Sequence, residues 1–154
     1  MNKGFTILEV VLGVSIIAIS MFSLMTVLNM SFQLMEESTR GIQASFLLEE
    51  GLESIRTLRD TSWDDNITTL SSDNAYYLVF SGGIWSSTSS NVFIDDIFDR
   101  SFVVNDVYRD SNDDIVNSGG SLDESTKKFT VSVSWSTKNG TTTKSISAFL
   151  SDLF

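Results

Sequence analysis

The chain begins with a long apolar run that constrains its fold more than any other feature. From Phe5 to Met30, a span of 26 residues, the only formally charged side chain is Glu9. A helix rises about 1.5 Å per residue, so this span is long enough to cross the hydrocarbon core of a bilayer. Lys3 precedes the run and favours a cytoplasmic N-terminus. We therefore predict one membrane-spanning helix over residues 5–30.

Two simpler interpretations of this run are a cleaved secretory signal and a plain signal anchor. The run is too long for the core of a secretory signal, only four residues precede it, and no small-x-small cleavage site follows it. A signal anchor is the stronger alternative, and only Glu9 argues against it. A carboxylate in an apolar span costs roughly 2–3 kcal/mol on insertion scales, so it usually has a partner. For a helix starting at Phe5 the natural partner is an N-terminal ammonium, its own or a neighbour's.

The residues around Glu9 resemble a known signal. The stretch Lys3-Gly4-Phe5-Thr6-Ile7-Leu8-Glu9-Val10 is similar to the N-terminal signal of type IV pilins and pseudopilins. The resemblance implies that a prepilin peptidase cuts between Gly4 and Phe5, removing residues 1–4 as a leader, and that Phe5 is then N-methylated. It also implies that Glu9 pairs with the N-terminal amine of an adjacent subunit in the filament core. The implied partners are other pilin subunits, the prepilin peptidase and an inner-membrane assembly platform.

The sequence departs from the family pattern in two places. Many family members have a proline midway along the apolar helix, whereas this chain has no proline and has Thr26 in that region. Local melting of the helix there is therefore expected to be absent or milder. Many members also close a C-terminal loop with a disulfide, which a chain without cysteine cannot form. A second and less specific resemblance, to minor pilin-like proteins, extends from Val107 through Gly119-Gly120 to the segment 127–135.

The helical pattern continues beyond the apolar run. One apolar stripe at spacings of three and four consists of Ala44, Leu48, Leu52, Ile55 and Leu58. Gly41 and Gly51 are weak points, each costing up to about 1 kcal/mol relative to alanine. We predict one helix from Phe5 to Arg59, whose outer half (31–60) lies against a sheet. Residues 60–66 then end the helix and start a connection, beneath which Trp63 packs.

Residues 61–154 have the period-two pattern of a small antiparallel domain. Phe129 to Trp135 alternates apolar with hydroxyl side chains, an Asn139-Gly140 turn follows, and residues 145–150 alternate again, which predicts a hairpin. Shorter strands are predicted at 76–80, 92–94 and 101–108, and residues 81–90 are predicted to form a surface loop. The predicted fold class is α+β, with a long N-terminal α-helix packed on a small antiparallel β-sheet, which is also the pilin architecture.

The composition excludes several functions. The chain has ten Lys and Arg and twenty Asp and Glu. Such an acidic chain repels phosphate backbones, so no direct nucleic-acid binding is expected. The chain has neither cysteine nor histidine, which removes thiol nucleophiles, Cys or His zinc sites and imidazole acid–base chemistry. No compact group of carboxylates and hydroxyls replaces them. We therefore expect neither an enzyme nor a cofactor.

One acidic segment has the spacing of a metal loop. Asp110, Asn112 and Asp114 form D-x-N-x-D, the start of a calcium loop built from hard oxygen ligands. However, Ile115 occupies the position of the turn glycine and Ser121 that of the twelfth-position glutamate. An Asp/Asn-rich turn between strands is the alternative, and it is the interpretation we favour over a calcium site.

These features favour one function and leave two others open. The favoured function is a structural subunit, a minor pilin, of a type IV pilus-like filament, which lies in the cytoplasmic membrane before assembly and in an extracellular filament afterwards. The first alternative is a pseudopilin of a type II secretion or DNA-uptake machine, which shares the same processing. The second is a membrane-tethered adhesin that uses Trp63, Trp85 or the Ser-rich loop.

Overall fold

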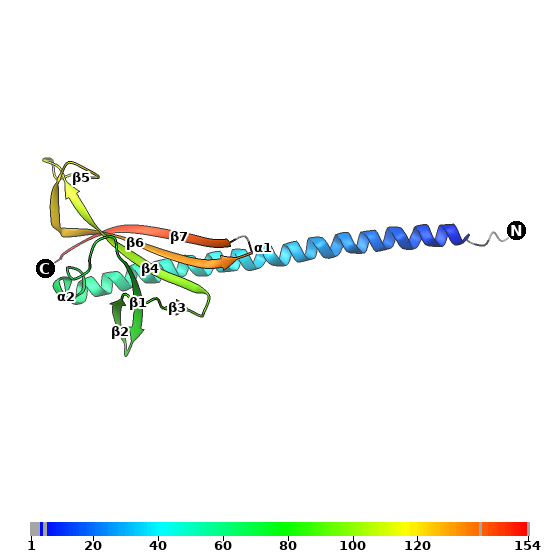
Figure 1. Cartoon of the computed structure of the whole chain (residues 1–154), viewed down its shortest axis with the longest axis horizontal. Helices are drawn as coiled ribbons and strands as arrows, with labels where there is room; N and C mark the ends of the chain where they lie inside the picture. Colours follow the sequence, from blue (N-terminus) through cyan, green and yellow to red (C-terminus); the bar gives the residue numbers. More distant parts are fainter. Residues whose placement is uncertain (1–3, 5, 139, 154) are drawn as a thin grey trace. The chain divides into compact units, whose positions relative to one another are not determined.

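The computed structural model describes residues 4, 6–138 and 140–153, so predictions that concern Phe5 and Asn139 lie outside the described residues. The chain divides into two compact units, unit 1 (Met1–Gly41) and unit 2 (Ile42–Phe154). Helix α1 (Ile7–Thr61) belongs to both units, and the remaining helix and strands belong to unit 2 (Figure 1). The long helix predicted to end at Arg59 is therefore present and ends at Thr61.

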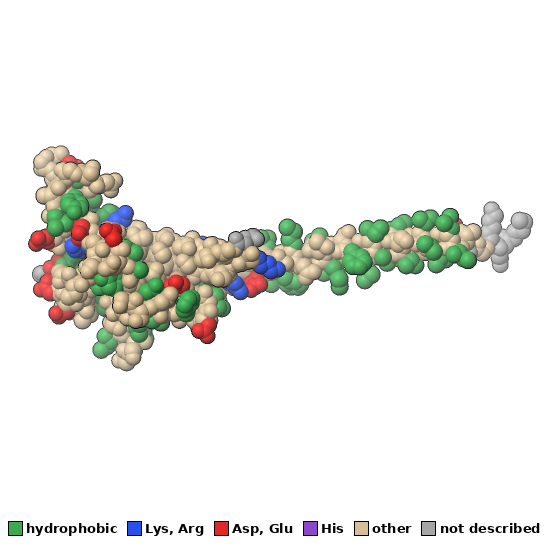
Figure 2. All heavy atoms as spheres, viewed as in Figure 1, with side chains coloured by type: hydrophobic (Ala, Val, Ile, Leu, Met, Phe, Trp, Pro, Cys, Tyr) green, Lys and Arg blue, Asp and Glu red, His purple; other side chains and the backbone are tan. Residues whose placement is uncertain are grey.

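Unit 1 contains the first part of α1, and the side chains of this part up to Thr39 are exposed. No side chain from Ile7 to Thr39 is buried or half-buried, and hydrophobic side chains cover this part of the helix in Figure 2. Six hydroxyls in this stretch donate to the carbonyl oxygen four residues earlier, at 2.7–3.0 Å: Ser15, Ser20, Ser23, Thr26, Ser31 and Thr39. Their polar atoms are thus partnered within the helix. The helix continues without interruption through Thr26, as expected for a chain without proline.

Unit 2 contains one antiparallel sheet. Its strands are β1 (Ala75–Ser81), β2 (Ile84–Thr88), β3 (Phe93–Ile94), β4 (Phe98–Arg109), β5 (Ile115–Val116), β6 (Ser121–Thr137) and β7 (Gly140–Ser151). The order across the sheet is β2-β1-β4-β6-β7, and the short strands β3 and β5 both pair with β4. Every pairing is antiparallel. The predicted α+β class, a long N-terminal helix packed on an antiparallel sheet, is confirmed.

The core of unit 2 lies between the second part of α1 and one face of the sheet. The predicted helical stripe is confirmed, since all its members are buried: Ala44, Leu48, Leu52, Ile55 and Leu58. Alternate residues of the central strands form the other side of the core: Phe98, Phe102 and Val104 of β4, and Phe129, Val131, Val133 and Trp135 of β6. The intervening side chains of β6 from Thr130 to Ser134 are hydroxyls on the opposite face. The period-two pattern therefore identified the buried face of β6 correctly.

Residues 81–90 do not form the predicted surface loop. Five of them form β2, which pairs with β1 between Ser81↔Ile84 and Tyr77↔Thr88. Only Gly82 and Gly83 separate the two strands, with φ of 62° and 84°. Positive φ at both central residues is the geometry of a type I′ turn, which glycine adopts without a steric penalty. The Gly-Gly pair is thus a hairpin turn within a segment whose serine content suggested a loop.

The predicted C-terminal hairpin is confirmed, with longer strands and a different turn position. β6 pairs with β7 from Thr126↔Ser151 to Thr137↔Gly140. Gly140 is therefore the first residue of β7, where the prediction made it a central residue of the turn. Asn139, the other predicted turn residue, lies outside the described residues.

The end of α1 is followed by a short helix where a connection was predicted. Helix α2 (Trp63–Asn66) starts after Ser62, whose hydroxyl accepts a hydrogen bond from Asp65 N at 3.1 Å and caps the helix. Asn66 Nδ2 donates to the carbonyl oxygen of Leu58 at 3.0 Å and ties α2 to the last turns of α1. Trp63 is 8% exposed and belongs to the core, as predicted.

Candidate functional site

The first turn of α1 contains a reciprocal hydrogen-bonded pair, Thr6 and Glu9. Thr6 donates to Glu9 Oε2 from its backbone N at 3.0 Å and from its hydroxyl at 3.1 Å. Glu9 N in turn donates to Thr6 Oγ1 at 3.4 Å. This is a capping box, in which a residue at the helix start and the glutamate three positions later satisfy each other's backbone amides. This capping box was not predicted, although the T-x-x-E pattern of Thr6 to Glu9 was a sufficient signal in the sequence.

The capping box accounts for one of the two carboxylate oxygens of Glu9. The described residues give no partner for Oε1, so the side chain keeps a free acceptor and a negative charge at the positive end of the helix dipole. The predicted cleavage position lies just before this turn. Gly4 is exposed, and a Cβ built on it would contact nothing within 4 Å. The predicted methylation of Phe5 lies outside the described residues.

Beyond this turn, α1 includes a stretch that is long and apolar enough to cross a membrane, and none of that stretch is buried. The most exposed large apolar side chains include Ile7, Phe22 and Met30, at 85%, 74% and 73% of their surface. Water solvates such a surface poorly, so a large uncovered apolar area indicates contact with lipid or protein. Because the hydroxyls of this stretch already have hydrogen-bond partners within the helix, the free-energy cost of placing them in lipid or against another protein is lower.

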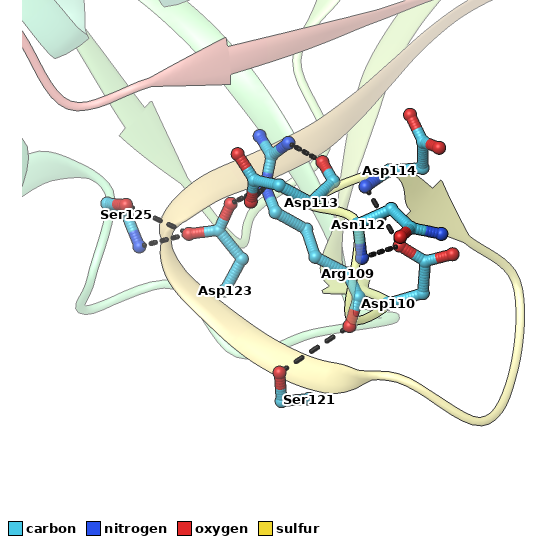
Figure 3. Close-up of polar contacts among 8 residues, drawn as sticks. All are labelled: Arg109, Asp110, Asn112, Asp113, Asp114, Ser121, Asp123 and Ser125. Carbon is cyan, nitrogen blue, oxygen red and sulfur yellow. Dashed lines mark hydrogen bonds and ion pairs between the residues drawn. The ribbon is translucent and has the colours of Figure 1, made fainter.

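The acidic segment 110–114 forms a turn that is held by its own hydrogen bonds (Figure 3). One oxygen of the Asp110 carboxylate, Oδ1, accepts from the backbone N of Asn112 at 2.8 Å and from that of Asp114 at 3.1 Å. Asp110 N also donates to the Asp114 carbonyl oxygen at 2.9 Å. Among the described residues, no group of three or more acidic side chains is placed to hold a metal ion. These contacts form an Asp/Asn-rich turn.

Arg109 connects this turn to β6. Its Nε donates to Asp123 Oδ2 at 2.6 Å, and its Nη1 donates to the Asp113 carbonyl oxygen at 2.8 Å (Figure 3). The other oxygen of Asp123 accepts from Ser125, from its backbone N at 3.0 Å and its hydroxyl at 2.8 Å. The hydrogen bond from Arg109, assisted by bonds from Thr126 and Ser125, holds the pKa of the Asp123 carboxyl far below its usual range. The contacts of Arg109 and Asp123 thus hold β4 and β6 together beyond the register shift at Asp106/Val107.

The aromatic residues considered for an adhesin have structural surroundings. Trp63 is in the core, as described above. Trp85 of β2 is half-buried, with its ring 5.0 Å from that of Phe80 and 5.5 Å from the guanidinium carbon of Arg100. Arg100 is 4% exposed and forms an ion pair with Glu50 of α1 at 2.8 Å. Arg100 was not among the predicted site residues, although its position between Phe98 and Phe102 on a period-two strand placed it on the buried face.

Comparison of the chain with protein-family models, curated proteins and solved structures gives no significant match.

Proposed function

We propose that the protein is a structural subunit of a type IV pilus-like extracytoplasmic filament. The observation that carries the proposal is the uncovered apolar surface of α1 between Ile7 and Met35, which starts with a single carboxylate, Glu9. A helix of this kind is stable in lipid or in a bundle of similar helices, but not in water. Unit 2 supplies the complementary part, a domain with its own core whose charged side chains are mostly acidic (Figure 2).

In this proposal, assembly transfers α1 from the bilayer into a bundle with other copies. The bilayer core covers about 20 helical residues, whereas exposed apolar side chains extend from Ile7 to Met35. Neighbouring helices in a bundle cover the whole stretch. Glu9 is costly in either environment unless a cation meets it, and the amine exposed by cutting after Gly4 supplies one on an adjacent copy. Oε1 of Glu9, which has no partner among the described residues, is available for that contact.

The decisive experiment is to map the N-terminal peptide by mass spectrometry in membrane fractions and in filaments sheared from the cell surface. A chain that starts at N-methylated Phe5 and is recovered in sheared filaments would support the filament subunit. Trimmed protein that is found only in membranes would favour the pseudopilin of a secretion or DNA-uptake machine. A chain that starts at Met1 or Asn2 in every fraction would identify a simple signal anchor and contradict the proposal.

A further inference from the structure

Unit 2 has an open groove with an apolar floor and an acidic rim. The groove has a volume of about 320 Å³ and is lined by one face of α1, the turn between β3 and β4, and the start of β4: Gln43, Phe46, Leu47, Glu50, Asp95 and Phe98. Phe46 is 67% exposed, although it is a large apolar side chain of a folded domain. The exposed ring of Phe46 and the apolar floor of the groove together form the apolar part of a candidate docking surface.

The rim carries negative charge that unit 2 does not neutralise. Asp95 is exposed and has no partner among the described residues, and Glu50 shares its carboxylate with Arg100 while remaining half-exposed. The β3–β4 turn holds Asp95 in place, because Ile97 N donates to the Ile94 carbonyl oxygen at 3.1 Å. Asp96, the next residue of the turn, adds a second exposed carboxylate. The groove therefore fits an occupant that is apolar along its length and cationic at its end.

Unit 2 itself offers one side chain of this kind. Over residues 42–154 it has eight Lys and Arg against seventeen Asp and Glu, a formal charge of −9, so contact between two copies needs a cation placed against carboxylates. Most of its cations already have a partner: Arg56, Arg59, Arg100, Arg109 and Lys127 pair with carboxylates, Lys144 with Ser45, and Lys128 with the ring of Phe149. Lys138 has none among the described residues, and it is exposed at the end of β6.

We propose that Lys138 of one copy docks in this groove of a second copy. The four-carbon stem of lysine would lie across Phe46 and Phe98, and its ammonium would meet Asp95 and Glu50 at the rim. The donor residue and the acceptor residues differ, so the contact is heterologous and can repeat from copy to copy. The inference rests on the proposed function, because a filament is what brings many copies together.

Cysteine cross-linking of the full chain tests this contact. The chain has no native cysteine, so an Asp95→Cys, Lys138→Cys double variant has only the two introduced thiols. Mild oxidation should convert it into a ladder of covalent multimers, in membranes and in sheared filaments, because each copy carries both halves of the contact. Each single variant should stay monomeric. A Glu124→Cys, Lys138→Cys pair, which replaces a different exposed carboxylate, should give no ladder.

The outcomes separate this inference from the proposed function. If trimmed chains enter filaments but the Asp95–Lys138 pair gives no ladder, or no more than the control pair, the contact is wrong and the filament function stands. If the wild-type chain is never trimmed yet the ladder forms in membranes, the contact is right and the filament function fails. Cross-linking of Asp95→Cys to a different protein alone would also overturn the self-contact.

Charge reversal gives an independent test. Lys138→Glu and Asp95→Lys should each lower the amount of protein in sheared filaments by about fivefold, the size expected for one ion pair of this kind. The double variant should recover most of that loss. Thermal unfolding of each variant checks that unit 2 still folds. A double variant that assembles no better than the single variants, with unit 2 folded in all three, would overturn the proposed pairing.

Discussion

Gly51 of α1 lies against Val131 of β6 so closely that a Cβ built on the glycine would be 2.9 Å from Val131 Cγ1. The same added atom would be 3.3 Å from Cδ of Arg100. In the sequence, Gly51 is a weak point of a long helix, since glycine lowers helix stability. In the structure it is the position that allows the helix backbone to approach the centre of the sheet. The gain from close packing there offsets the lower helix propensity.

The first prediction is that Gly51→Ala destabilises unit 2. Overpacking a tight contact costs typically about 1–3 kcal/mol, and the better helix propensity of alanine returns up to about 1 kcal/mol. We therefore expect a net loss of up to about 2 kcal/mol in the free energy of unfolding. Thermal unfolding of the full chain in detergent, followed by tryptophan fluorescence, measures this loss in unit 2, since all three tryptophans lie there.

Gly13→Ala is the matched control for this prediction. Gly13 lies in the same helix, and an added Cβ there would contact nothing within 4 Å. The control should leave the unfolding of unit 2 unchanged. If Gly51→Ala stabilised unit 2, the contact with Val131 would not be as close as described.

The second prediction concerns the ion pair between the buried Arg100 and the half-exposed Glu50. Nη1 of Arg100 donates to Glu50 Oε2 at 2.8 Å, and its Nε has no partner among the described residues. Glu50→Ala would remove the main counter-charge of a guanidinium that is 4% exposed, so we expect a loss of about 1–3 kcal/mol in unfolding free energy. Glu49→Ala, which removes an exposed neighbour, should change it little. Equal losses for the two variants would show that the ion pair contributes nothing.

The third prediction separates the two roles of Glu9. Glu9→Gln keeps an acceptor for Thr6 and therefore the capping box, but it removes the charge. We expect trimmed, membrane-inserted protein whose recovery in sheared filaments falls about tenfold or more, because an adjacent amine would lose its counter-charge. Thr6→Ala, which removes the hydroxyl of the cap and keeps the charge, should still assemble. Immunoblots of the two fractions measure both effects.

The reverse pattern would change the interpretation of Glu9. Normal assembly of Glu9→Gln together with poor assembly of Thr6→Ala would show that the capping box, and no intersubunit ion pair, is what the filament requires. Glu9→Ala removes both interactions, so it should be at least as defective as the worse of the two variants.

The secondary structure was predictable where one local pattern decided it. The helical stripe from Ala44 to Leu58 and the alternation from Phe129 to Trp135 both identify buried faces, because their periods match the geometry of a helix and a strand. The core between them followed from those two patterns. The β1–β2 hairpin was missed because serine and glycine suggest a loop by composition, whereas the turn depends on the conformation of two glycines.

The site contacts were less predictable because they join residues that are distant in sequence. The resemblance placed Glu9 in an assembly role, but the local capping box with Thr6 needed the T-x-x-E pattern to be considered by itself. The groove could not be predicted at all, since Phe46 and Asp95 meet only after the helix packs on the sheet. Pairing of Glu50 with Arg100 depends on the same packing.

The last prediction is a loss of unit 2 stability at acid pH that depends on Asp123. Its pKa is lowered in the folded chain, chiefly by the hydrogen bond from Arg109, whereas an unfolded chain has a value of about 3.9. Below about pH 5 the unfolded state therefore binds more protons than the folded state, and this contribution to stability decreases as the pH falls. Asp123→Asn should lower the unfolding temperature at pH 7 and flatten its decrease between pH 5 and pH 2, while Glu124→Gln should do neither. If the unfolding temperature of the wild-type chain decreased no more steeply between pH 5 and pH 2 than that of Asp123→Asn, the Arg109–Asp123 contact would not stabilise the fold.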